Sequence, residues 1–285
     1  MYSTTSVEYI KNVQFLFEEG TFKSSPQQFH QIYTNFGYKD NHYISIVFFL
    51  QPGKLKAVYQ KMWSTFQSLY EQVNGATFDN KTIYLDFLGN ITLRGCLFHL
   101  KQSWWRKINQ LGLATEFQDQ ESEIGSFLRL TFGLPFLDFL DVFESFALDI
   151  TLEAPVDERI DSYLDYLLKT YMHSSSLFLL TVWASNRFNI KRTTNGCEAF
   201  HKQLNSMFYS AHPTVFELVD RLQDVIFESG FKMRGADDTT RSKTATERKK
   251  AVWIEEIKKQ FEDGTIDRKF YLRRISCTGL PATCL

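Results

Sequence analysis

The sequence has no apolar run that is long enough to cross a bilayer, and residues 1–6 lack the charged and apolar regions of a signal peptide. It is also poor in cysteine, because its 285 residues include only four, spread widely along the chain. Such spacing fits free thiols better than a disulfide framework. These absences exclude a membrane-spanning or secreted protein and predict a reducing setting, in the nucleus or the cytoplasm.

An excess of charge of one sign is missing too, since the formal net charge is −1 at pH 7. Nucleic-acid-binding proteins usually have a basic surface, because neutralising phosphates supplies most of their non-specific affinity. Composition alone therefore weighs against autonomous DNA binding. The sequence also lacks a glycine-rich phosphate loop, a nucleophile elbow and a dinucleotide-binding fingerprint, which excludes the enzyme classes built on those motifs.

Apolar residues, by contrast, are abundant: 44% of the chain is hydrophobic and 27 residues are Phe. This content predicts a globular protein with one large domain or two small ones. Three apolar segments, residues 12–17, 29–36 and 42–50, predict strands, and the last is so apolar that both of its faces must be covered. Residues 54–73 predict a helix, because their apolar side chains recur at steps of three and four. This order indicates an α/β fold with a central sheet.

A further helix is predicted near residue 195, where residues 193–195 offer oxygens that can cap it. Its buried face is expected to contain four apolar positions: Cys197, Phe200, Leu204 and Met207 or Phe208. That phase places Glu198, His201 and Asn205 along an adjoining stripe, since residues three, four and seven apart are helical neighbours. A carboxylate, an imidazole and an amide beside an apolar face can line a cleft, although a solvated helix face is the commoner explanation of such a stripe.

Residues 192–213, which contain this stripe and end in Ala211-His212-Pro213, resemble the acidic-residue helix of Mutator-like (MULE) transposases. Those enzymes are of the DDE type and have a ribonuclease-H-like core. In that family this helix carries the last of three metal-binding carboxylates. The resemblance places Glu198 at that position.

Two earlier stretches are similar to the same family. Glu19-Gly20-Thr21-Phe22-Lys23 resembles its first-strand motif, Asp-Gly-Thr-Phe-Lys, with Glu19 in place of the aspartate. Asp86-Phe87, at the end of a predicted strand over residues 82–87, resembles its Asp-Phe-Glu signature, with Leu88 in place of the glutamate. The resemblance implies that Glu19, Asp86 and Glu198 hold two Mg²⁺ or Mn²⁺ ions for DNA strand cleavage and transfer. Without it, Glu18 and Glu19 at a strand end would be ordinary solvated charge.

Residues 91–108 resemble the fifth strand of the family and the helix that follows it, yet only Leu88-Gly89-Asn90 separates them from the predicted Asp86 strand. Parallel neighbours need a crossover of about a dozen residues or more. We therefore expect the fifth strand either to pair antiparallel or to be displaced from the sheet. In the helix, we expect one of Trp104 and Trp105 to be a core residue and Arg106-Lys107 to be exposed, with nucleic-acid contact as the alternative.

Two cysteine–histidine pairs, Cys96 with His99 and Cys197 with His201, have spacings that metal ligands also use. Together they offer the donor set of a tetrahedral zinc site. The ordinary alternative, which we favour, is that both cysteines are small core residues and both histidines are hydrogen-bonded. In the resembling family these residues recur beside the active site, which implies that His99 and His201 hold a phosphate or an acid in place.

The predicted architecture is a ribonuclease-H-like mixed sheet flanked by helices and interrupted by an all-helical insertion. The discontinuous core is expected to comprise residues 1–112 and 191–231, with the helical insertion at 113–190. Residues 232–285 are expected to form a charged helical tail, and residues 248–262 within it a solvated helix for which nucleic-acid contact is the alternative.

The predicted function is that of a degenerate or domesticated transposase with weak or no catalysis. Its motifs are altered at Glu19 and Leu88, and the zinc-finger DNA reader that relatives carry ahead of this domain is not found in the sequence. The alternative is a non-catalytic DNA- or protein-binding module that retains the fold. The resemblance implies DNA as the partner, a nuclear location and, as a further possibility, a homo-oligomer.

Overall fold

A computed structural model describes residues 1–13, 15–39, 41–78, 82–84, 93–173, 175–176, 178–184, 195–238 and 245–277. The chain forms two compact units, each of which is built from two separate segments. The first unit comprises Met1–Arg94 and Thr194–Lys243, and the second comprises Gly95–Thr193 and Thr244–Leu285. Among the helices of the described residues, none combines the length and the hydropathy needed to cross a membrane.

The first unit is a mixed α/β structure. Its strands are β1 (Phe15–Thr21), β2 (Gln31–Lys39), β3 (His42–Gln51), β4 (Thr82–Tyr84) and β5 (Leu93–Arg94). Its helices are α1 (Thr4–Glu8), the 3₁₀ turn η1 (Tyr9–Asn12), α2 (Lys56–Asn74), α9 (Asn195–Ser206) and α10 (Val215–Asp238). The three long strands and α2 confirm the predicted order, whereas the helical segment ahead of β1 was not predicted.

The strands form one sheet in the order β3-β2-β1-β4-β5. The first three pair antiparallel, and β4 and β5 continue the sheet in parallel to β1. Both arrangements expected for the fifth strand are therefore wrong, since Leu93 lies opposite Ile83 in parallel register. The paired residues Ile83 and Leu93 are ten positions apart in the chain, so the segments that pair are separated by more than the tripeptide considered from sequence.

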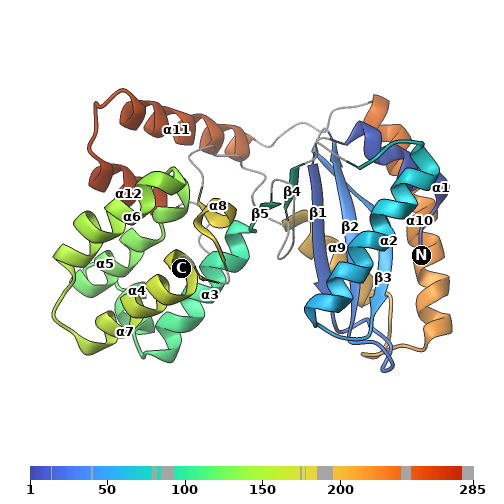
Figure 1. The fold of residues 1–285 in the computed structure, drawn as a ribbon, viewed down its shortest axis with the longest axis horizontal. Coiled ribbons are helices and arrows are strands. Elements are labelled where there is room, and N and C mark those ends of the chain that lie inside the picture. The colour runs from blue at the N-terminus through green and yellow to red at the C-terminus, as the bar shows by residue number, and fades with distance from the viewer. Residues whose placement is uncertain are drawn as a thin grey trace. The chain divides into compact units, whose positions relative to one another are not determined.

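Helices cover both faces of this sheet (Figure 1). Because side chains alternate along a strand, neighbouring residues of β1 belong to different cores. Leu16 packs with α1 and α2, and Phe17 packs on the opposite face against Cys197 of α9. Helix α10 packs on that same face through Leu218 and Leu222. The sheet therefore presents two separate buried surfaces, one under α2 and one under α9 and α10.

The second unit is helical (Figure 1). Its α-helices are α3 (Leu97–Gln110), α4 (Ala114–Gln118), α5 (Glu123–Thr131), α6 (Phe139–Ser145), α7 (Glu158–Leu167), α8 (Leu180–Trp183), α11 (Ala245–Glu262) and α12 (Arg268–Ser276). Shorter helical turns are η2 (Leu134–Phe136), η3 (Phe146–Ile150), η4 (Thr151–Glu153) and η5 (Leu168–Met172). The prediction that residues 113–190 are helical is confirmed for the part of them that the structure describes.

This division of the chain differs from the predicted one in two places. Helix α3 belongs to the helical unit, because its apolar face packs with those of α5 and α7. Helices α11 and α12 belong to the same unit and are not a solvated tail: Ile254 and Leu272 are fully buried in its core. The charge run of α11 is only one face of the helix, and the apolar positions between the charges form the other.

Ion pairs hold α12 to the rest of the helical unit. Arg268 donates from Nε to Asp149 Oδ2 at 2.5 Å and lies 3.3 Å from Glu144 through Nη1. Lys269 pairs with Glu153 next to it. The C-terminal helices are therefore joined to α6, η3 and η4 by charge as well as by apolar contact.

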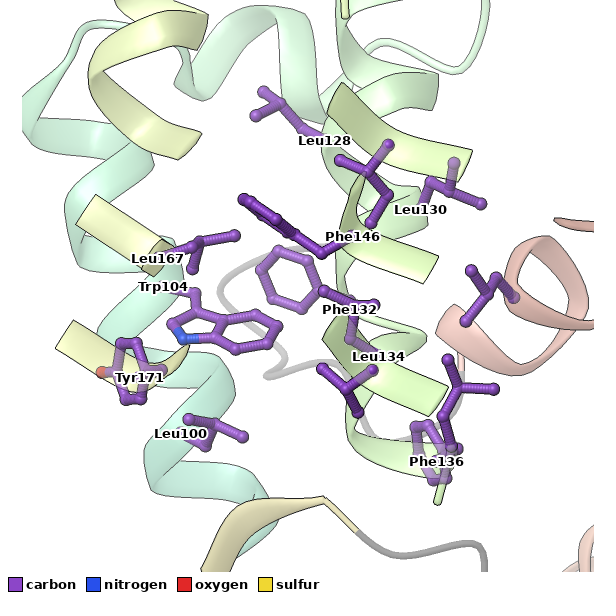
Figure 2. Close-up of a cluster of buried hydrophobic side chains, with 14 of the residues drawn as sticks. Leu100, Trp104, Leu128, Leu130, Phe132, Leu134, Phe136, Phe146, Leu167 and Tyr171 are labelled. Carbon is purple, nitrogen blue, oxygen red and sulfur yellow. The ribbon is translucent and has the colours of Figure 1, made fainter. Parts of the chain in front are cut away.

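An aromatic cluster forms the centre of the helical unit (Figure 2). Trp104 has no exposed surface, and its ring makes edge-on contacts with the rings of Phe132, Tyr171 and Trp183 at centroid distances of 5.6–5.8 Å. Trp105 is also buried, at 8% exposure. The expectation that only one of the two is a core residue is thus wrong, and neither ring is presented for stacking on a base.

Candidate functional site

Two of the three predicted acids lie together in the first unit. Glu19 is on the α9 side of β1, because strand alternation places it on the same face as Phe17. Glu198 is in the first turn of α9. A carboxylate oxygen of Glu19 lies within 4.8 Å of one of Glu198. Both residues line an open cleft of about 490 Å³, between the end of β1 and one side of α9.

His201, one turn after Glu198, lines the same cleft. Its Nδ1 lies 3.8 Å from Glu19 Oε2, and the side chain is only 7% exposed. Burial lowers the pKa of His201 to about 4, so the imidazole is neutral near pH 7. Within the described part of the chain its Nε2 has no hydrogen-bond partner. The site therefore combines two acids with an uncharged nitrogen donor.

Glu18 lies on the other face of the sheet and does not contribute to the cleft. It is 3% exposed, and its Oε1 accepts a hydrogen bond from Asn35 Nδ2. Burial raises the pKa of Glu18 well above its ordinary value, and a hydrogen bond with Tyr33 opposes that rise. The interpretation of this pair as solvated charge is wrong for Glu18, which is buried, whereas Glu19 is partly exposed to the cleft.

Asn205, the last member of the predicted stripe, connects α9 to the segment that follows β1. Its Oδ1 accepts a hydrogen bond from the Ser24 hydroxyl. His212, in the turn after α9, donates its backbone N–H to the Lys23 carbonyl at 2.9 Å, and its Nδ1 lies 2.9 Å from the Ser25 carbonyl oxygen. These contacts hold the end of β1 beside α9, and so keep Glu19 near Glu198.

A glycine allows the close approach of α9 to the sheet. A Cβ atom on Gly196 would lie 2.3 Å from the ring of Tyr43 in β3. That ring is itself packed against Phe17 and Tyr38, with centroid distances of 5.1 and 4.9 Å. The start of α9, and with it Glu198, can therefore take this position only when residue 196 has no side chain.

We expect Gly196→Ala to lower the free energy of unfolding by about 1–3 kcal/mol, because the added methyl must displace a packed aromatic ring. A glycine in a helix is ordinarily about 1 kcal/mol less favourable than alanine. Gly230→Ala in α10 is the matched control, since its added Cβ would meet only the end of Arg234, at 3.8 Å. Urea denaturation of both variants checks the prediction, which a stabilising effect at both positions would contradict.

The remaining predicted site residues are Asp86, Cys96, His99 and Cys197. Asp86 lies outside the described residues, so its predicted role as the second acid stays a prediction. Cys96 and His99 belong to the helical unit, where Cys96 precedes α3 and the His99 ring contacts that of Phe98 at 5.5 Å. Cys197 is fully buried among aromatic side chains, which accounts for it as a core residue without a zinc ion.

Several residues of the cleft, among them one aromatic and two basic ones, were not singled out from the sequence as site residues. Phe22 and Lys23 follow β1, and Lys202 follows His201 on α9. The signal for Lys202 was available, because residue 202 lies one turn after Glu198 and is therefore on the same side of the helix. Phe22 and Lys23 were part of the family-like motif, but their place beside Glu198 depends on how β1 and α9 pack.

Comparisons of the chain with protein-family models, with curated proteins and with solved structures found no match. The function proposed below therefore rests on the residues of this cleft and on the motifs that contain them.

Proposed function

We propose that the chain is a MULE transposase-derived domain of ribonuclease-H-like fold, with a divalent-cation site and weak or no DNA cleavage activity. The observation that carries the proposal is the approach of Glu19 and Glu198, from β1 and α9, to within 4.8 Å of one another at their oxygens. Mg²⁺ binds carboxylate oxygens at about 2.0–2.1 Å, so the two oxygens can share one ion once they lie about 4.2 Å apart or less, the largest separation that such bonds allow. DNA phosphates in the nucleus are the expected substrate.

The order of the chain supports the proposal. Three antiparallel strands precede a helix, the sheet is mixed and covered on both faces, and a helical segment separates β5 from the acid-bearing α9. This is the layout that the resemblance to the transposase family implies. The three motif blocks also occur along the chain in the family's order.

The proposed loss of activity follows from the composition of the site. Two-metal phosphoryl transfer requires ions held about 3.5–4 Å apart by carboxylates in fixed positions. Glu19 has one methylene more than the aspartate of the family motif, and Leu88 supplies no carboxylate where the family has one. One ion can be held here, but the geometry for two is altered.

Calorimetric titration with Mn²⁺ or Mg²⁺ tests the site directly. We expect saturable binding to the wild-type protein and a loss of affinity of about tenfold or more in Glu198→Ala, because the ion loses a charged ligand. Asp86→Ala tests the third expected ligand in the same way. Glu228→Ala, which removes an equal charge from an exposed position of α10, is the control and should bind as the wild type does.

Absence of binding by a wild-type protein that melts cooperatively would contradict the metal site. That result would favour the second candidate function, a DNA- or protein-binding module that retains the fold without chemistry. The observation in its favour is that exposed Lys23 and Lys202 line the same cleft as the acids, and can bind phosphate without a metal.

A further inference from the structure

The cleft has a second half that the metal site does not use. Phe22, Lys23 and Lys202 line it beside the two acids. Both lysines are exposed, and neither is in an ion pair within the described residues. Phe22 is 44% exposed, which is unusual for a large aromatic side chain next to a buried strand end. Two cations and an open aromatic ring thus adjoin the carboxylates.

Phe22 is held in place although it is exposed. The ammonium of Lys54 lies 4.2 Å from the centre of its ring, and the ring of His30 meets it edge-on at 5.5 Å. The exposed part of the ring is therefore presented as a fixed apolar surface with positive charge near it. That combination of an aromatic face and cations is what single-stranded nucleic acids bind, with the base on the ring and the phosphate on the cations.

The backbone that carries Phe22 and Lys23 is also held in place. The Ser24 hydroxyl bonds to Asn205, and His212 bonds to the carbonyls of Lys23 and Ser25. These bonds join the segment after β1 to the helix that carries Lys202. A surface ordered before the ligand arrives loses less entropy on binding, and so binds more tightly.

We propose that this half of the cleft binds an unpaired nucleotide of single-stranded DNA, with its base on Phe22 and its phosphate on Lys23 and Lys202. A duplex cannot place a base face on Phe22, because its bases are already stacked on one another. The cleft volume of about 490 Å³ lies in the range of pockets that enclose small ligands. The inference deepens the proposed function, on which it rests for the identity of the polymer.

The test is the fluorescence anisotropy of a labelled oligothymidylate titrated with the protein in EDTA, with a duplex of equal length as the comparison. We expect the single strand to bind at least about tenfold more tightly than the duplex. Phe22→Ala is expected to weaken single-strand binding by about tenfold, within the range measured for base–aromatic stacking. Lys202→Gln is expected to reduce the magnitude of the slope of log K against log salt concentration by about 0.7, the value for one phosphate contact on a single strand.

The chain offers a matched control in the same unit. Phe231 of α10 is 55% exposed and has Arg234 over its ring at 4.6 Å, but it does not line the cleft. Phe231→Ala should leave single-strand binding unchanged. Circular dichroism melting of each variant separates lost binding from lost structure, and a Phe22→Leu variant that melts as the wild type does repeats the test if Phe22→Ala is unstable.

Equal affinity for single strand and duplex, or equal effects of Phe22→Ala and Phe231→Ala, would overturn the inference. These outcomes are distinct from failure of the metal site, because the binding is measured without metal. A protein that binds no Mn²⁺ but prefers the single strand would retain this inference and lose the proposed cation site. A protein that binds Mn²⁺ but does not prefer the single strand would retain the proposed cation site and lose this inference.

Discussion

Replacing Trp104 by alanine is expected to lower the free energy of unfolding of the helical unit by about 3–5 kcal/mol, the range for truncating a buried Trp or Phe. Trp104 has no exposed surface, and α3 places it among side chains from η2, α7 and η5 (Figure 2). Its ring contacts three other aromatic rings, so its loss removes these contacts and opens a cavity that rigid neighbours cannot fill.

Urea denaturation followed by tryptophan fluorescence is a suitable measurement, because the helical unit retains Trp105, Trp183 and Trp253 in this variant, whereas Trp63 is in the other unit. Phe143→Ala is the control, since it removes an aromatic ring that is 53% exposed on α6 of the same unit. We expect that substitution to lower the free energy of unfolding by less than about 0.5 kcal/mol. A cost for Trp104→Ala as small as that of the control would show that the cluster is not the centre of the core.

Glu18→Gln is expected to stabilise the first unit, and increasingly so as the pH rises. The folded state raises the pKa of Glu18 above its ordinary value of 4.5, so the unfolded chain releases this proton first. Above about pH 4.5 the unfolded state therefore binds fewer protons than the folded state. The free energy of unfolding of the wild-type protein then falls by up to about 1.4 kcal/mol per pH unit, until the folded carboxyl ionises. Glutamine does not titrate, so the variant does not lose stability in this way. Its amide oxygen can still accept the hydrogen bond from Asn35.

The measurement is the difference in unfolding free energy between Glu18→Gln and the wild type at several pH values between about 5 and 8. Taking the difference removes the contribution of His201, whose lowered pKa acts in the opposite sense: stability is lost as pH falls from 6.5 toward about 4. Glu8→Gln, at an exposed position of α1, is the control. A difference that is the same at every pH would contradict a protonated Glu18 in the folded protein.

The local structure of this protein was largely predictable because it depends on spacing. The three long strands, the helix α2 and the buried face of α9 through Cys197 and Leu204 were predicted from periodicity, and the structure confirms them. The stripe of Glu198, His201 and Asn205 followed from the same phase and lines the cleft. Helical and strand periods are properties of the backbone, so a single chain segment is enough to reveal them.

Partners distant along the chain were not predictable in the same way. Residues 248–262 were predicted to form a solvated helix, because charged residues dominate their sequence. In the structure, Ile254 and Ile257 of this segment are buried in the core of the helical unit. The burial of Glu18 was missed for a related reason. Two adjacent acids in a strand point to opposite faces, and whether each face is covered depends on α2 and α9, which are encoded elsewhere.

The sequence by itself determined where the three long strands and the helices α2 and α9 lie, and which face of α9 carries Glu198. Only the tertiary structure decided that β5 pairs in parallel, that Glu19 meets Glu198 beside a neutral His201, and that Phe22 and two lysines share their cleft. Periodicity reports on one element at a time, whereas these features need the packing of β1 against a helix that begins about 170 residues later. Such packing depends on shape and burial across the whole unit, as the close contact of Gly196 with Tyr43 illustrates.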